Sequence, residues 1–154
     1  MAAPLIETKG LKKYFKSPRG LLHAVDDVSL TIKRGETIGV VGESGCGKST
    51  LGRTILRLIE PTAGEVLYDG TNIVGYNRKQ MQKIRSEMQM IFQDPFTSLN
   101  ARMSICEIIS DPMKVLGNVK GKKAIRNKVK ELMDLCGLPE RYVNTYPHEL
   151  DGGR

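Results

Sequence analysis

The stretch that decides the fold is GESGCGKST, which runs as Gly42-Glu43-Ser44-Gly45-Cys46-Gly47-Lys48-Ser49-Thr50. It matches the pattern G-x-x-x-x-G-K-[ST] and lies between an apolar, β-branched run and a segment of helical periodicity. Its glycines let the backbone curl with N–H groups pointing inward, and the following helix presents its positive end to the same space. The stretch therefore predicts a phosphate-binding loop for the β- and γ-phosphates of a nucleotide.

Two side chains of this loop have predicted roles in nucleotide binding. Lys48 places a compact positive charge on the phosphates, and the Ser49 hydroxyl ligates Mg²⁺. Cys46 is interpreted as a small spacer within the loop. Kinases, G proteins, motor proteins and transport ATPases all share such a loop, so it predicts the ligand class and not the reaction. The predicted nucleotide site of the loop consists of Gly42, Glu43, Ser44, Gly45, Cys46, Gly47, Lys48, Ser49 and Thr50.

The elements around the loop predict an α/β fold. Residues 37–41 (TIGVV) are expected to form a strand buried on both faces. Apolar spacing from residue 48 to residue 59 predicts a helix that Pro61 stops. Two extended runs within residues 5–32 flank the breaker cluster at 16–20, which predicts an antiparallel pair. The other predicted elements are a hairpin strand at 64–70, a helix at 78–86, a buried strand at 88–93, and helices at 105–109 and 122–136.

A change of sequence pattern at Gln93-Asp94 predicts two domains. Residues 1–93 are expected to form a partial P-loop NTPase core with an N-terminal antiparallel β subdomain. Residues 94–154 show helical periodicity that Pro and Gly residues interrupt. The second part is therefore predicted to be a helical subdomain.

Composition narrows the class of protein. The 154 residues are 40% hydrophobic and 27% charged, which is typical of a soluble globular protein. No stretch approaches the roughly 20 apolar residues of a membrane span, and the N-terminus lacks a signal-peptide layout, so a cytoplasmic location is expected. Three cysteines without C-x-x-C spacing argue against a disulfide framework or a zinc site.

The net charge of +7 indicates a polyanionic partner, either a nucleotide, a nucleic acid or an anionic membrane surface. A basic run lies at the start of the predicted helix at 122–136, and it is interpreted first as a solvated face, with attraction to an anionic membrane as the lesser alternative. Nucleic-acid binding is disfavoured because no aromatic residues interleave with these charges. The run consists of Lys120, Lys122, Lys123, Arg126, Lys128 and Lys130.

Several segments together resemble the ATP-binding subunits of ATP-binding-cassette (ABC) transporters, most closely the oligopeptide/dipeptide importer branch. The resemblance covers essentially the whole chain, because the matching segments occur in family order. They are LKKYF (11–15), AVDDVSLTIKRGETIGVVGESGCGKST (24–50), EVLYDG (65–70), MIFQDPFTSLNARMSI (90–105) and YPHELDGG (146–153).

The resemblance implies roles for residues outside the loop. Phe15 occupies the position of an aromatic that stacks on adenine, with Tyr14 as the neighbouring candidate; without the resemblance, a strand core residue is the favoured interpretation of Phe15. Gln93 matches a glutamine that reaches the Mg²⁺ and attacking-water region, which makes Lys48 and Gln93 the implied catalytic residues; by itself Gln93 is a turn residue before Asp-Pro. The segment from Asp94 to Asn100 resembles the part that faces the membrane subunits.

Leu150–Arg154 (LDGGR) occupies the place of the family signature, which is usually Leu-Ser-Gly-Gly-Gln. In the family this loop contacts the nucleotide of the opposite subunit. Asp151 and Arg154 depart from the signature, and a carboxylate near a γ-phosphate repels it, so the contact is expected from the backbone N–H groups of Gly152 and Gly153.

The resemblance also implies ATP and Mg²⁺ as cofactors. The implied partners are a second ATP-binding subunit in a head-to-tail dimer, integral membrane permease subunits and, indirectly, a peptide-binding protein. The implied location is the inner face of the cell membrane, where the subunit is peripheral.

The segments that the family uses after the signature do not occur in these 154 residues. We therefore expect an intact relative to be an ATPase that drives peptide import, and this chain alone to bind nucleotide with negligible turnover. Two other hypotheses remain at this point. One is a non-catalytic nucleotide-binding or regulatory module, and the other is a P-loop kinase, which the QDPFTSLN and YPHELDGG segments disfavour.

Overall fold

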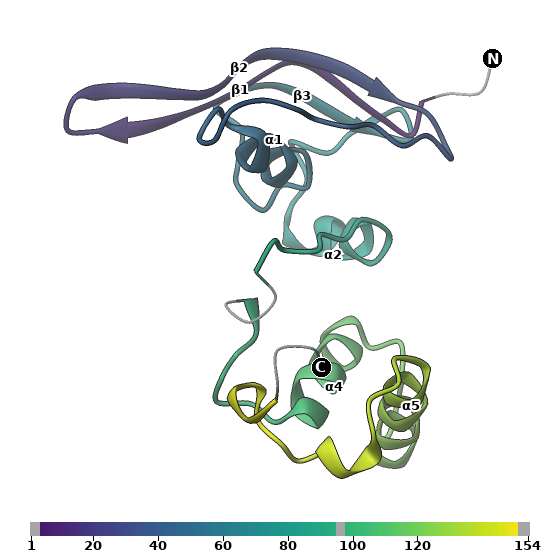
Figure 1. Cartoon of the computed structure of the whole chain (residues 1–154). Coiled ribbons are helices and arrows are strands. Elements are labelled where there is room, and N and C mark those ends of the chain that lie inside the picture. Colours follow the sequence, from purple (N-terminus) through teal and green to yellow (C-terminus); the bar gives the residue numbers. More distant parts are fainter. Residues whose placement is uncertain (1–3, 95–97, 151–154) are drawn as a thin grey trace. The chain divides into compact units, whose positions relative to one another are not determined.

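The computed structural model describes residues 4–94 and 98–150, and the chain divides into two compact units (Figure 1). The first unit is Met1–Gln89 and the second is Met90–Arg154. The functional assignment of residues 1–93 and 94–154 as core and helical subdomain stays a prediction. No helix among the described residues is long and apolar enough to cross a membrane.

A four-stranded antiparallel sheet with the order β2-β1-β3-β4 forms the first unit. β1 (Ile6–Ser17) and β2 (Gly20–Ile32) form the long hairpin that the sequence predicts, with its turn at Pro18-Arg19. β3 (Ala63–Tyr68) pairs with the other edge of β1. β2 therefore lies at one edge of the sheet, with one row of backbone groups available to other parts of the unit.

The predicted Asp-Gly hairpin is confirmed. Asp69 and Gly70 both take positive φ values, 48° and 77°, and connect β3 to the short strand β4 (Thr71–Asn72). Two consecutive residues of positive φ give the turn geometry that matches the right-handed twist of paired strands. Asp tolerates this conformation and Gly adopts it freely, so the dipeptide determines the connection.

α1 (Lys48–Ile55) is shorter than predicted, because it ends well before Pro61. The backbone of Arg57 takes a positive φ of 50°, which is incompatible with a continuing helix. The Arg57 side chain is buried and donates hydrogen bonds to the carbonyls of Ile73 and Tyr76, at 2.6 and 3.0 Å. These contacts explain the early end of the helix, which the helical spacing in the sequence does not reveal.

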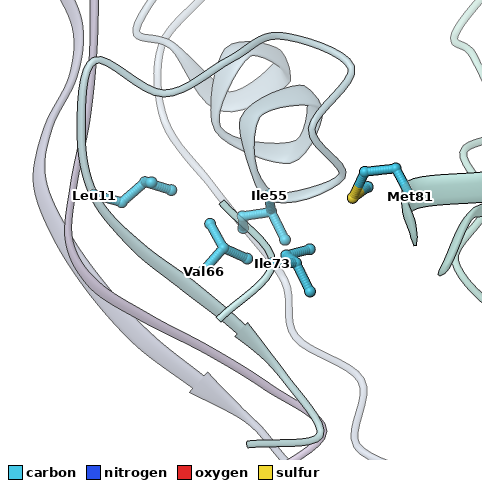
Figure 2. Close-up of a cluster of buried hydrophobic side chains, with 5 residues drawn as sticks. All are labelled: Leu11, Ile55, Val66, Ile73 and Met81. Atoms are coloured by element: carbon cyan, nitrogen blue, oxygen red, sulfur yellow. The ribbon is translucent and has the colours of Figure 1, made fainter. Parts of the chain in front are cut away.

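The core of the first unit lies between the sheet, α1 and α2 (Arg78–Glu87), as Figure 2 shows. α2 confirms the predicted helix at 78–86 and begins at a capping box between Asn77 and Gln80. The buried side chains of this core are Leu11, Ile55, Val66, Ile73 and Met81.

The two predicted buried strands, at 37–41 and 88–93, are wrong. Neither segment is a strand, and the side chains of Val41 and Ile91 are each 96% exposed. A strand needs a neighbour to satisfy its N–H and C=O groups, and within the described part of the chain neither segment has one. Apolar, β-branched composition indicated the strand but carried no information about its partner.

The described part of the second unit contains two helices, which lie where the sequence predicts helices. α4 (Ile105–Leu116) and α5 (Lys122–Leu135) pack together around Ile105, Met113, Val129 and Met133. Two 3₁₀ turns, η1 (Glu140–Tyr142) and η2 (Pro147–Glu149), follow. α4 is longer than predicted: it continues through Pro112, keeps Met113 buried and ends at Gly117, whose φ is 67°.

A capping box at the start of α4 makes a prediction about pH. Glu107 accepts hydrogen bonds from the Ser104 backbone N–H (2.8 Å) and the Ser104 hydroxyl (2.9 Å), and in that order these lower the pKa of Glu107 below its ordinary value. A carboxylate whose pKa is lower in the folded state stabilises that state above its unfolded pKa, and loses this effect as pH falls through the folded pKa.

We expect Glu107→Gln to be less stable than the parent at pH 7, and the difference to shrink as pH falls below about 4.3, the ordinary pKa of a glutamate. Urea midpoints measured between pH 7 and pH 3 test this. Asp111→Asn removes a carboxylate from the same helix outside the capping box and serves as the control. A stability difference that stays constant across this range would contradict the assignment.

Candidate functional site

The phosphate-binding loop precedes α1 and ends on two glycines in left-handed conformations. Gly45 has a φ of 80°, and Gly47, with a φ of 95°, is the N-cap of α1. Gly47 has no side chain to cap the helix, and the first turn of α1 contains no acidic residue. The N–H groups at the start of α1 therefore present a positive end to an anion.

Gly47 also lies against the edge strand β2. A methyl group added at its Cα would lie 2.0 Å from the carbonyl oxygen of Ala24, which is far inside a van der Waals contact. Gly42, by contrast, would meet the Sγ of Cys46 at 2.7 Å. The close approach at Gly47 involves backbone on both sides, so it fixes the position of the loop relative to the sheet.

The Lys48 ammonium folds back over its own loop. Its Nζ donates a hydrogen bond to the carbonyl of Gly42 at 2.9 Å and a second one to the carbonyl of Glu43, and lies 3.6 Å from the Sγ of Cys46. These carbonyl partners are neutral, so a phosphate oxygen would compete favourably for the same ammonium. The loop thus presents its positive charge at the helix start.

A cavity of about 300 Å³ joins this loop to the β1–β2 hairpin. From the predicted site it includes Phe15 and the last six residues of the loop, although at least thirty positions separate them in the sequence. Gly42, Glu43 and Ser44 do not line it. Phe15 is half-buried, and the Nζ of Lys13 lies 4.9 Å from its ring centroid. The lining consists of Phe15, Leu22, His23, Ala24, Gly45, Cys46, Gly47, Lys48, Ser49 and Thr50.

Sequence reasoning missed the β2 part of this wall. Phe15 pairs with Leu22, and the next residues, His23 and Ala24, approach the loop. The signal that could have found them is the hairpin register, because a two-residue turn at Pro18-Arg19 sets which residues oppose each other.

His23 is held by a small polar network. Its ring stacks on Tyr14 with centroids 3.8 Å apart, and its Nδ1 lies 3.1 Å from a carboxylate oxygen of Asp26. The Tyr14 hydroxyl donates a hydrogen bond to the same carboxylate. The hydrogen bond from Tyr14 has the largest effect in lowering the pKa of Asp26, and the one from His23 has the next largest. The hydrogen bond between Tyr14 and Asp26 also raises the pKa of Tyr14. At neutral pH Asp26 is therefore ionised and Tyr14 protonated, which orients the imidazole.

The positions of the remaining predicted site residues relative to this cavity stay predictions. Gln93 belongs to the second unit, whereas the loop belongs to the first. Gly152 and Gly153, with Asp151 and Arg154, lie outside the described residues, as do residues 95–97. The exposed Ser49 does line the cavity, and its hydroxyl oxygen is the kind of ligand that Mg²⁺ takes.

Comparison with known proteins gives one consistent result. A family model described as "ABC transporter" matches residues 25–154. The chain is 49% identical over 155 residues to "Oligopeptide transport ATP-binding protein OppF" of Bacillus subtilis, covering 100% of this chain and 51% of that protein. It is 45% identical over 143 residues to the protein of the same name from Salmonella typhimurium, covering 93% and 43%. The chain spans about half the length of these relatives.

Solved structures agree with the sequence relatives. A dimeric structure of the ATP-binding cassette MJ0796 bound to ADP and Pi superposes with a TM-score of 0.80 at 28% identity, covering 96% of this chain and 64% of that one. A second dimeric structure of the same cassette gives a TM-score of 0.78 at 29% identity, with the same coverage. The predicted α/β P-loop fold class is thereby confirmed.

Proposed function

From the premise that this chain belongs to the ABC transporter family, we propose that it binds ATP as part of a subunit that energises import of oligopeptides or dipeptides. The observation that carries the proposal is the cavity in which Phe15 of the hairpin meets the start of α1. An apolar ring at one end and a cationic loop at the other match the two chemically different ends of a nucleotide. The names of the sequence relatives support peptide import.

In the proposed complex the adenine packs on Phe15, and the phosphates accept hydrogen bonds from the N–H groups at the start of α1. Lys48 exchanges its two carbonyl partners for phosphate oxygens, because a charge-assisted hydrogen bond is stronger than a neutral one. The Ser49 hydroxyl holds Mg²⁺, which when bound neutralises phosphate charge. The orientation of His23 by Asp26 adds a polar side chain to the same wall.

For catalysis, we propose that Lys48 stabilises negative charge on the transferred phosphoryl group and that Gln93 reaches the metal and the attacking water. The 154-residue chain by itself is expected to bind ATP with little turnover. The segment that leads into the loop, residues 37–41, is exposed and pairs with no described strand. Phosphoryl transfer depends on precise positioning of the reacting groups, and an unpaired segment before the loop does not hold the loop precisely enough.

The proposed assembly is a head-to-tail pair of ATP-binding subunits, in which Gly152 and Gly153 contact the nucleotide of the opposite subunit. The dimeric structures of the cassette MJ0796 support such a pairing. The proposed further partners are integral permease subunits, through which the protein is peripheral on the inner face of the membrane, and a peptide-binding protein that supplies the solute.

The proposal is tested by Lys48→Ala. Removing the ammonium should weaken ATP binding by roughly 30- to 1,000-fold, which corresponds to about 2–4 kcal/mol for a charge-assisted phosphate contact. Calorimetric titration of ATP in the presence of Mg²⁺ measures it. Arg53→Ala removes the same charge from the last turn of α1 and should leave the affinity within about threefold, since charges exposed to water interact weakly over distance. Equal losses in both variants, or none in either, would refute the proposed phosphate site.

A further inference from the structure

The second unit contains a cavity of about 420 Å³ that the proposed function does not use. It lies between α4, the first turns of α5 and the segment after η1. Two residues of the basic run, Lys122 and Arg126, therefore contribute to a concave site. The lining consists of Cys106, Glu107, Ser110, Lys114, Lys122, Ile125, Arg126, Val143 and Asn144.

Charge in this cavity is unbalanced. Lys114, Lys122 and Arg126 line it, and none of them forms an ion pair with a carboxylate in the part of the chain that the structure describes. Glu107 is the one carboxylate in the lining, and it already accepts two hydrogen bonds from Ser104. Glu107 and Glu140 offset part of this charge, because they interact electrostatically with Lys114 and Arg126, but three cations against one carboxylate still leave the lining with an excess of positive charge that a bound anion would offset.

The start of α5 adds to this imbalance. Gly121, the N-cap, supplies no side-chain hydrogen bond, and the first turn contains no acidic residue. Instead it begins with Lys122 and Lys123, which place positive charge at the positive end of the helix macrodipole. Such a placement is unfavourable and runs against the usual preference for Asp or Glu in a first turn. An anion near Lys122 would offset this cost, because it attracts both the lysine and the positive end of the helix.

The other residues that line the cavity fit more than a bare ion. Ile125, Val143 and Cys106 supply apolar surface, while Ser110 and Asn144 supply polar atoms. The volume falls in the range of sites for small organic ligands and greatly exceeds that of inorganic phosphate. A phosphate carried by a small organic group satisfies both the cations and the apolar wall.

We propose that this cavity between α4 and α5 binds a phosphate ester, with Lys122 and Arg126 as the principal phosphate contacts and Lys114 as the third cation. Two sources share this chemistry: a soluble phosphate monoester, and the headgroup of an anionic phospholipid. The proposal does not depend on ATP binding at the loop, because all of its residues belong to the second unit.

The test uses the whole chain with Lys48→Ala, so that the phosphate-binding loop does not compete. Glycerol 3-phosphate is titrated at constant ionic strength, balanced with chloride, and the melting temperature is followed. We expect a saturable rise. Replacing Lys122 and Arg126 by Gln should weaken the apparent affinity at least about tenfold, since charge-assisted contacts dominate such sites. Replacing Lys120 and Lys123 by Gln removes the same charge outside the cavity and should change it less than about threefold.

A second arm separates the two sources. Sedimentation with phosphatidylglycerol vesicles is compared with sedimentation with phosphatidylcholine vesicles, using the same pair of double variants. Binding of vesicles that requires Lys122 and Arg126 while glycerol 3-phosphate binds weakly supports the lipid source, and the reverse supports the soluble one. Equal effects of the two double variants in both arms, or no binding beyond the chloride control in either, would overturn the proposal. Circular dichroism checks that each variant is folded.

Discussion

Gly47→Ala is expected to destabilise the protein by roughly 2–5 kcal/mol and to abolish measurable ATP binding. Two effects add. The φ of 95° is unfavourable for any residue with a Cβ, and the new methyl would lie 2.0 Å from the Ala24 carbonyl oxygen. The atoms that this methyl would meet all belong to the backbone of Ala24, so no side chain can rotate away to relieve the clash. Urea unfolding and ATP titration measure the two losses.

Gly45→Ala provides the matched control, because it makes the same chemical change in the same loop at a similar φ of 80°. No heavy atom lies within 4 Å of the added methyl. Only the conformational cost remains, which is about 1–2 kcal/mol. Equal destabilisation by the two substitutions would mean that the contact with β2 contributes nothing.

Arg57→Ala is expected to reduce the stability of the first unit by about 3–4 kcal/mol. Arg57 is 8% exposed, and its guanidinium bonds to the carbonyls of Ile73 and Tyr76 as well as to Glu60. Truncation leaves two carbonyls without their donors and opens a space where the side chain lay. The midpoint of urea unfolding, followed by circular dichroism, measures the effect.

Two further variants serve as controls for the loss of stability in Arg57→Ala. Arg53→Ala removes an exposed arginine of α1 and should change stability by less than about 0.5 kcal/mol. Arg57→Lys keeps the charge but has a single ammonium in place of the guanidinium fork, so an intermediate loss is expected. If Arg57→Lys were as stable as the parent, the multiple hydrogen bonds would be irrelevant and charge alone would matter.

Local chemistry explains what could be predicted from sequence. The Asp69-Gly70 turn, the helix at 78–86 and the long hairpin follow from residues adjacent in the chain. The helix that follows the glycine-rich loop was equally accessible, because the loop pattern is continuous in sequence, whereas the phosphate-binding role of the loop stays a prediction. Each of these features needs no information about distant partners.

Apart from the length of α4, the errors involve contacts that are distant in sequence. Residues 37–41 have strand composition, yet a strand exists only when another segment pairs with it. α1 ends early because Arg57 donates hydrogen bonds to the carbonyls of Ile73 and Tyr76, which lie sixteen and nineteen positions later in the sequence. Within the cavity, Phe15 was identified only through resemblance, and His23 was missed because its position depends on the register of two paired strands.

The contact between Gly47 and Ala24 also has a consequence for which ligands can fit. Leu22 pairs with Phe15, which is proposed to contact the base, and Ala24, two residues along the same strand, lies against Gly47 of the proposed phosphate site. Two residues of strand span roughly 7 Å. The two ends of the cavity are therefore joined by a short rigid length of β2 and cannot separate independently. The length of a ligand that contacts both ends of the cavity is therefore limited by the backbone of β2 more than by any side chain.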